Sequence, residues 1–269
     1  MALYVNGKKV CPTIQAGGGG SALGITREAS AQGKLQMPTS SFTYSLPSNV
    51  TDVGDYALFY AFYNCTGLTS VDLSSLTTVS GTAAMYYGFR DCANLVSVDL
   101  SNLVVISSAS ALYDAFYNCS NLSSVDLSSL TTVSSNDGMG YAFCNCTSLL
   151  SINLSSLITV GYRGLINAFY GCSNLSSVDL SSLTEITGTY ALANAFRYCT
   201  SLTSLSFPAL TSTSFGTATN QLTGMLQNVT GCTVHFPSNL QSVIGSWSDV
   251  TAGFGGINTT VSFDLPPTT

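Results

Sequence analysis

Residues 61–79 read Ala-Phe-Tyr-Asn-Cys-Thr-Gly-Leu-Thr-Ser-Val-Asp-Leu-Ser-Ser-Leu-Thr-Thr-Val, and this phrase returns through most of the chain. Every copy holds a cysteine with a phenylalanine three residues before it and a leucine three residues after it. The cysteines are spaced 27, 27, 27, 26 and 27 residues apart, at Cys65, Cys92, Cys119, Cys146, Cys172 and Cys199. A fixed period of this length predicts stacked units that bury a hydrophobic face which no single unit could cover alone.

The first half of each unit has the alternation of a β-strand. Val71 and Leu73 are expected to point into the core, and Asp72 between them is expected to point outward. Similar triplets recur from Tyr44-Ser45-Leu46 to Val261-Ser262-Phe263. We therefore expect about nine coils with parallel strands about 4.8 Å apart, the last two coils being degenerate and capping the array.

The second half of each unit has the spacing of a short helix. Met85, Phe89 and Cys92 fall at i, i+4 and i+7, which predicts one apolar helical face. The residue before most cysteines, such as Asn64 or Asp91, tolerates a left-handed conformation and is expected to end that helix. Because helices are wider than strands, we expect an α/β repeat: a curved solenoid with parallel strands on the concave side and short helices on the convex side.

This pattern resembles the BspA-type leucine-rich repeats of bacterial surface proteins. The resemblance rests on Ala115-Phe116-x-x-Cys119-x-x-Leu122-x-x-Val125-x-Leu127 and its counterparts, and it covers about residues 42–265. In the central coils Leu-Ser stands where the family has Ile-Pro after the strand. The resemblance implies a leucine-rich-repeat solenoid and a mostly non-enzymatic protein whose usual role is adhesion to host proteins or other cells. The family has no fixed binding motif, so the resemblance identifies no ligand residue.

The composition excludes several classes of protein. Only 7% of the 269 residues are charged, against about 25% in an average domain, and serine and threonine fill over a quarter of the chain. A mean hydropathy of +0.34 argues against disorder. Polar residues or glycine interrupt every apolar run, so no membrane span is expected. The net charge of −6 argues against a nucleic-acid partner.

Residues 1–40 differ in character from the rest. They hold all three lysines and one arginine against a single acid. Leu3–Val10 reads as a hairpin with an Asn-Gly turn, and Gln15–Gly24 reads as a glycine-rich linker. We interpret residues 1–40 as an attachment segment that docks to a larger assembly, and residues 41–269 as the displayed solenoid. No secretory signal pattern follows Met1, so an extracellular or cell-surface location and a virion surface both remain open.

Two sets of equivalent residues on the strand face, with one residue in each coil, are candidate binding residues; we call such a set a column. The first is an acidic ladder in which repulsion between stacked like charges is expected to raise one or more pKa values, formed by Asp72, Asp99, Asp126, Asn153 and Asp179. It either attracts cations or a basic partner, or it is a solvated face that keeps the solenoid soluble. The second is a ladder of hydroxyl groups suited to sugars, although the aromatic platforms usual in sugar sites are missing, at Ser70, Ser97, Ser124, Ser151, Ser177 and Ser204.

The column two residues before each cysteine is the preferred candidate for partner binding. Its members alternate between tyrosine and arginine near the expected helix end, at Tyr63, Arg90, Tyr117, Cys144, Tyr170 and Arg197. Tyrosine and arginine are enriched at binding hot spots, and neighbours of these types can form cation–π pairs. The competing interpretation is packing along the convex side.

The remaining reactive side chains favour no enzyme. Equivalent cysteines of stacked coils point the same way, so we expect buried thiols rather than disulfides, and Cys144-x-Cys146 is too isolated for a zinc site. The single histidine, His235, lies in a degenerate coil. We therefore expect no catalysis, cofactor or metal. The preferred function is adhesion or recognition of a host protein or glycan. A phage or prophage tail-associated receptor-binding or decoration protein is the alternative, and a glycan-processing enzyme the remote one.

Overall fold

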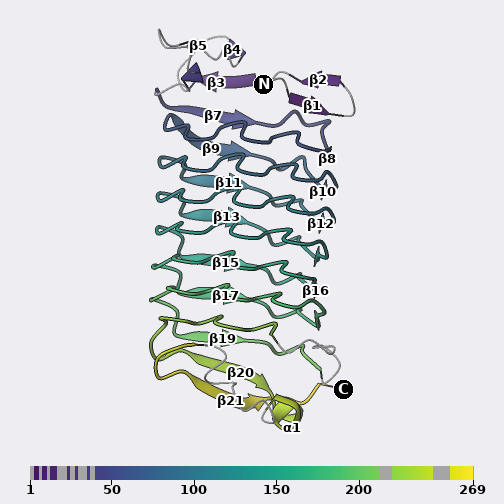
Figure 1. The fold of residues 1–269 in the computed structure, drawn as a ribbon, viewed down its shortest axis with the longest axis vertical. Coiled ribbons are helices and arrows are strands. Elements are labelled where there is room, and N and C mark those ends of the chain that lie inside the picture. The colour runs from purple at the N-terminus through teal and green to yellow at the C-terminus, as the bar shows by residue number, and fades with distance from the viewer. Residues whose placement is uncertain are drawn as a thin grey trace.

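The computed structural model describes residues 40–211, 220–244 and 255–268, together with the backbone of six short strands in the first 36 residues. The chain forms a parallel-strand solenoid of about eight turns (Figure 1). All nine predicted strand positions are occupied, by β7 (Phe42–Ser45), β9 (Leu68–Asp72), β11 (Ser97–Asp99), β13 (Ser124–Asp126), β15 (Ser151–Asn153), β17 (Ser177–Asp179), β19 (Ser204–Ser206), β20 (Thr233–Pro237) and β21 (Thr260–Leu265). The strands from β7 to β17 lie in one sheet that forms the main wall, and β19, β20 and β21 form a separate parallel sheet in the C-terminal coils. Their parallel registers confirm the stacking of equivalent residues.

A second wall follows each main strand after a corner. Its parallel two-residue strands are β8 (Asp52–Val53), β10 (Thr78–Val79), β12 (Val105–Ile106), β14 (Thr132–Val133), β16 (Thr159–Val160) and β18 (Glu185–Ile186). The second residue of each strand is buried, as Val53 and Val79 are, and the first faces outward. This alternation closes the core on its second side.

The third wall is a ladder of turns, so the predicted short helices on the convex side are wrong. Along residues 54–65, alternate N–H groups donate to the carbonyl three residues earlier, as Ala57 does to Gly54 at 3.2 Å. The N–H groups between them donate to the next coil, as Leu58 does to Ala84 at 2.6 Å. Among the described residues the one α-helix is α1 (Gln241–Ile244), which follows the 3-10 turn η1 (Ser238–Leu240) in the C-terminal cap.

Left-handed residues explain why the turn wall is not helical. Tyr56, Tyr60 and Asn64 have φ values of 55°, 53° and 56°, and the following coils repeat this every fourth residue. Such residues cannot continue a right-handed helix. The prediction of a left-handed residue before the cysteine is confirmed at Asn64 and Asp91, but there it is the last of three such residues rather than a helix end.

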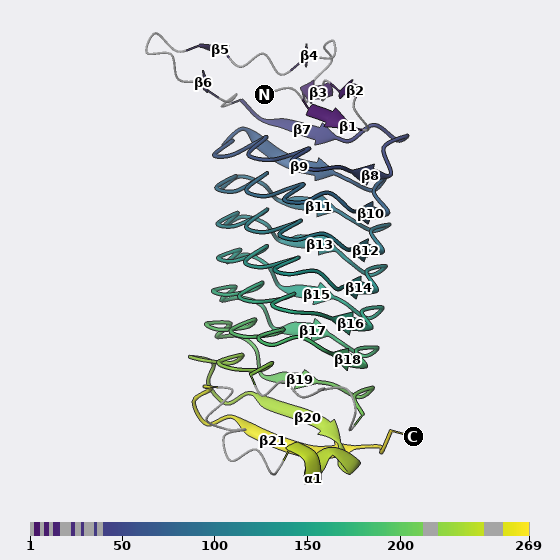
Figure 2. The ribbon, with the colours of Figure 1, turned by 45° about the vertical axis from the view of Figure 1, so that its right-hand side comes forward.

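The absence of helices from this wall also removes the reason for curvature. All three walls are hydrogen-bonded from coil to coil, so all three rise by the same step. The coils stack in a straight column in both views, and the predicted bend is not observed (Figures 1 and 2).

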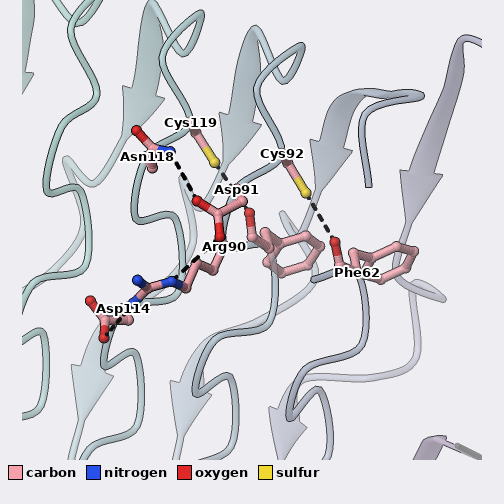
Figure 3. Close-up of polar contacts among 8 residues, drawn as sticks. Phe62, Arg90, Asp91, Cys92, Asp114, Asn118 and Cys119 are labelled. Carbon is pink, nitrogen blue, oxygen red and sulfur yellow. Dashed lines mark hydrogen bonds and ion pairs between the residues drawn. The ribbon is translucent and has the colours of Figure 1, made fainter. Parts of the chain in front are cut away.

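Stacked phenylalanines and cysteines fill the corner between the turn wall and the main wall. Neighbouring rings lie parallel within 4° to 7°, with centroids 5.1–5.6 Å apart from Phe62 to Phe196. The cysteine sulfurs donate to phenylalanine carbonyls of the preceding coil, as Cys92 does to Phe62 at 3.1 Å (Figure 3). The eight described cysteines are buried and form no disulfide with one another, which confirms the prediction of buried thiols for them.

The backbone of the N-terminal segment extends the main wall. Strands β1 (Leu3–Val5) and β2 (Lys8–Val10) pair antiparallel, as predicted, and their Asn-Gly turn lies outside the described residues. Strand β3 (Thr13–Ala16) pairs antiparallel with β7, and β4 (Leu23–Gly24) pairs with β3. Strands β5 (Glu28–Ala29) and β6 (Leu35–Gln36) form a separate antiparallel pair. Much of the predicted linker lies outside the described residues.

Candidate binding surfaces

The main wall carries a shallow groove of about 790 Å³ that crosses β9, β11, β13 and β15. The acidic ladder lies along this groove, with Asp72 opposite Asp99, Asp99 opposite Asp126, and Asp126 opposite Asn153. Asp179 continues the same register beyond Asn153. Four members of the hydroxyl ladder, Ser70, Ser97, Ser124 and Ser151, also line the groove, and its lining includes no aromatic side chain. The groove therefore offers hydroxyl and carboxylate groups without a stacking platform.

Each member of the acidic ladder closes a local turn. The Oδ1 atom accepts a hydrogen bond from the N–H two residues further on, for example from Ser101 to Asp99 at 3.0 Å. Asn153 accepts the same bond from Ser155 at 3.0 Å, so the turn needs the oxygen atom and not the charge. This shared geometry is a structural reason for Asp or Asn in the column.

The pKa of Asp72 is lowered, which is opposite to the direction predicted for one or more members of the ladder. Hydroxyl groups of Ser74 and Ser45 donate to this carboxylate at 2.6 and 2.7 Å. These hydrogen bonds favour the charged form and hold the pKa of Asp72 below its ordinary value. At this position hydrogen bonding outweighs repulsion from the next carboxylate.

The turn wall brings the preferred tyrosine and arginine column into contact with two acids. The Nη1 atom of Arg90 donates to Asp114 of the next coil at 3.1 Å, and its Nε lies 3.5 Å from Asp91 (Figure 3). The guanidinium carbon lies 4.0 Å from the Tyr117 ring centroid and 4.7 Å from that of Tyr87. The predicted cation–π pairing is therefore present at Arg90, whose charge is already neutralised by neighbours.

Asp114 is the buried member of this cluster, with only 5% of its surface exposed. Burial raises its pKa to about 6, although the Arg90 guanidinium acts in the opposite direction. Asp114 belongs to none of the candidate columns, because it lies five residues before Cys119 rather than two. Its burial depends on tyrosines from neighbouring coils, which no local pattern reveals.

An aromatic patch on the same wall was likewise not among the candidate columns predicted from the sequence. We call it the tyrosine surface, and it consists of Tyr56, Phe59, Tyr60, Tyr63, Tyr86, Tyr87 and Tyr113. Tyr60 stacks on Tyr87 at 4.8 Å with an interplanar angle of 7°, and Tyr86 stacks on Tyr113 at 5.3 Å. Tyr56 and Tyr63 are exposed by 56% and 42%. The recurrence of rings five and six residues before successive cysteines was the available signal.

The other members of the predicted column lie farther along the turn wall. Cys144 is buried, whereas Tyr170 and Arg197 are half-buried. The Arg197 guanidinium carbon lies 5.6 Å from the Tyr170 ring centroid, so a second cation–π contact is present. The column is thus interrupted at Cys144, and its two arginines belong to separate clusters.

The remaining polar chemistry of the described residues is sparse. His235 Nδ1 lies 2.9 Å from both carboxylate oxygens of Asp264, and this contact lowers the pKa of Asp264. Within the described ranges, no three histidine, cysteine or acidic side chains gather closely enough to hold a metal ion. No helix among the same residues has the length and apolar character needed to cross a bilayer.

The repeat pattern matches a known family model. Residues 38–137 and 113–244 match the model described as "BspA type Leucine rich repeat region", in six copies. No curated protein matches the chain.

Several solved structures are similar to the chain at low identity. A TLR13–ssRNA13 complex is 20% identical over 74% of this chain, with a TM-score of 0.41. A leucine-rich cell surface protein from Faecalibacterium prausnitzii is 15% identical over 82% of this chain and 78% of its own length, with a TM-score of 0.23. A leucine-rich repeat protein from Bacteroides ovatus is 16% identical over 85% and 96%, with a TM-score of 0.20. The chain spans 26% of the TLR13 chain.

Proposed function

Because the chain belongs to the BspA-type leucine-rich repeat family, we propose that it is a non-catalytic adhesion protein that recognises a protein or glycan on a host or cell surface. The tyrosine surface is the observation that carries this proposal. It gathers rings from three successive coils on one wall: the first coil contributes the exposed Tyr56, Tyr60 and Tyr63, and the next two contribute half-buried rings that stack on them or on one another. Tyrosine offers a large, amphipathic contact area and loses little side-chain entropy on binding.

The rings of this surface are held in place before any partner arrives. Tyr60 stacks on Tyr87, and Phe59 stacks on Tyr86 with centroids 5.6 Å apart. The ion-paired Arg90 lies beside Tyr87 and restrains the edge of the patch. A partner would therefore meet a preorganised surface, which lowers the entropic cost of association.

A binding screen with matched variants tests the proposal. The full chain is applied to a glycan array and a panel of purified cell-surface proteins, beside a Tyr56→Ser/Tyr60→Asn double variant. Both replacements occur at the same register in other coils, as Ser110 and Asn167, where the backbone is also left-handed. The control is Tyr190→Ser, which removes a 38% exposed ring far from the tyrosine surface.

We expect a partner that binds the unmodified chain and the control and that loses at least tenfold in affinity to the double variant. Loss of one or two anchoring rings at a hot spot costs about 2 kcal/mol or more. Equal binding by the double variant would exclude the tyrosine surface. A partner that is chemically converted during the assay would contradict the non-catalytic role.

The virion alternative is favoured by one feature of the N-terminal segment. Strands β1 and β2 form a two-stranded sheet outside the solenoid walls. A hairpin of this size is marginal alone and gains stability by docking on another surface. Binding of a peptide covering residues 1–40 to purified phage tail particles would support a tail-associated role, and tail genes beside the coding gene would support it independently.

A further inference from the structure

Two arginines at the same position of the repeat have opposite surroundings. Arg90 is ion-paired with Asp91 and Asp114, at 3.5 and 3.1 Å. The Arg197 guanidinium makes no ion pair or hydrogen bond with any described residue, and its Nε atom is buried without an acceptor. Leaving a charged donor unsatisfied is costly, so the contrast points to a missing anionic partner.

The repeat register shows which residues stand beside Arg197 at the positions of the two acids that pair with Arg90. Tyr198 stands where Asp91 follows Arg90, and both have φ values near 60°. The N–H of Asn194 donates to Thr223, as that of Tyr87 donates to Tyr113. Gly224 therefore occupies the place of Asp114, with the same left-handed backbone. Asp114 neutralises Arg90, but the equivalent residue beside Arg197 is a glycine and carries no side chain.

Aromatic rings and amides surround the unpaired guanidinium. Its carbon lies 5.3 Å from the Tyr198 ring centroid and 5.6 Å from that of Tyr170. The two rings are 5.3 Å apart at 66°, and Tyr198 is 38% exposed. The side-chain amide oxygens of Asn194 and Gln227 both lie close to Gly224. The cluster thus offers a cation, phenol rings and amide groups within one patch.

The pairing of the other described arginines and the negative net charge of the chain favour a ligand with a single acid group. Among the described arginines Arg163 is paired with Asp137 at 3.1 Å and Arg90 is paired twice, so Arg197 alone is free of a carboxylate. A partner with a run of acidic residues would be repelled by the chain, whose net charge is −6. Its further acids would also find no second unpaired arginine among the described residues. One carboxylate on a ring that can stack fits this patch better.

We propose that Arg197 binds the carboxylate of a terminal acidic sugar, with Tyr170 and Tyr198 contacting the sugar ring and the Gln227 amide contacting a hydroxyl group. Arginine is suited to this role because its fork of donors matches a carboxylate bidentately. This subsite deepens the proposed recognition role by naming a ligand class. It does not depend on the tyrosine surface.

The experiment follows the side-chain Nε–Hε resonances of the four arginines in the full, ¹⁵N-labelled chain. Glucuronate is the probe, glucose the neutral sugar, acetate the carboxylate without a ring, and N-acetyl-Glu-Glu-Glu-amide the acidic peptide. Arg197→Gln removes one resonance and so assigns it. We expect glucuronate to shift the Arg197 resonance saturably, at a concentration at least tenfold lower than acetate or glucose, while the Arg90 resonance stays in place.

A designed counter-ion provides the matched control. Gly224→Asp copies the Asp114 arrangement, and aspartate already occupies left-handed positions in this wall. Its Cβ would press on the Asn194 amide oxygen, at the end of a side chain that can rotate. Tyr198→Asp, which copies Asp91, is the second variant. Gly224→Asp is expected to weaken glucuronate binding about tenfold or more, because the added acid occupies the guanidinium; Tyr198→Asp should weaken it at least as much, because it also removes a ring that contacts the sugar.

The outcomes separate this subsite from the proposed function as a whole. Equal shifts from acetate or glucose, a stronger response to the acidic peptide, or full binding by both folded aspartate variants would overturn the subsite. The Tyr56→Ser/Tyr60→Asn variant should bind glucuronate like the unmodified chain. If it does, while the array shows no partner for the tyrosine surface, the subsite stands and only the tyrosine surface is excluded.

Discussion

Arg90 Nη1 donates a hydrogen bond to Asp114 Oδ2 across two neighbouring coils, over 3.1 Å. The carboxylate is buried, with Tyr87 beside it, and the guanidinium lies over the Tyr117 ring. This ion pair links the same two coils as the hydrogen bond that the Asn118 amide donates to Asp91 at 2.9 Å, in addition to their backbone hydrogen bonds and packing. It also places a titratable group inside the turn wall, with consequences for stability that depend on pH.

Asp114 should make the protein more stable as the pH falls from 7 to 4. Burial raises its pKa from 3.8 to about 6, so the folded state binds this proton more tightly than the unfolded state. The contribution is fully present below about pH 3.8 and is lost as the pH rises through about 6. Asp114→Asn removes it, and we expect the stability difference between the two proteins to change by roughly 2 kcal/mol between pH 7.5 and pH 4.5.

Urea unfolding at pH 4.5 and pH 7.5 measures this difference. The lowered pKa values of Asp72 and Asp264 act in the opposite direction, but below about pH 4, so they do not mask the effect. Parallel pH profiles for the two proteins would show that Asp114 titrates as an ordinary carboxyl group.

Asp126 should be replaceable by asparagine but not by alanine. Its Oδ1 accepts the N–H of Ser128 at 2.9 Å, and Asn153 makes the equivalent bond one coil later. We expect Asp126→Asn to leave the unfolding free energy unchanged, and Asp126→Ala to lower it by about 1 kcal/mol because the turn N–H loses its acceptor. Chemical denaturation of both variants measures these unfolding free energies. Equal stabilities would mean that the carboxylate oxygen has no structural role.

The described cysteines should resist thiol reagents in the folded protein. Burial raises the pKa of Cys119 and Cys199 to about 12, and that of Cys65 and Cys232 to about 11. At pH 8 these thiols are neutral and inaccessible, so DTNB should modify none of the eight until denaturant is added. Reductant should leave the melting temperature unchanged. Rapid modification of Cys119 under native conditions would contradict the buried ladder.

The strands and the core were predictable from the sequence because their signals are local and repeated. Val71 and Leu73 alternate with Asp72, and this period of two indicates a β-strand. The 27-residue spacing then places each strand beside its counterpart. The same reasoning located the buried cysteines, since equivalent side chains in stacked coils share one environment.

The turn wall was not predictable in this way, because its apolar spacing fits two structures. Met85, Phe89 and Cys92 suit one helical face, but they also suit turns of four residues. The choice is decided by hydrogen bonds to the next coil, such as that from Phe89 to Ala115 at 2.8 Å. The lack of a carboxylate beside Arg197 among the described residues was not predictable for a related reason, because Gly224, which stands where Asp114 pairs with Arg90, belongs to another coil.

The backbone of the turn wall should reverse the usual preference for alanine over glycine. Asn167 lies in the middle of the segment expected to be helical, and its φ is 51°. In a helix Asn167→Ala would be more stable than Asn167→Gly by about 1 kcal/mol. In the left-handed conformation the order is opposite, with glycine favoured by about 1 kcal/mol or more. Both replacements remove the same side chain, so their difference in urea unfolding isolates the backbone term. Gly224 already occupies this position of the repeat in a later coil, with a φ of 63°, which shows that the wall accepts glycine. An alanine variant as stable as the glycine variant would mean that this wall is helical in solution.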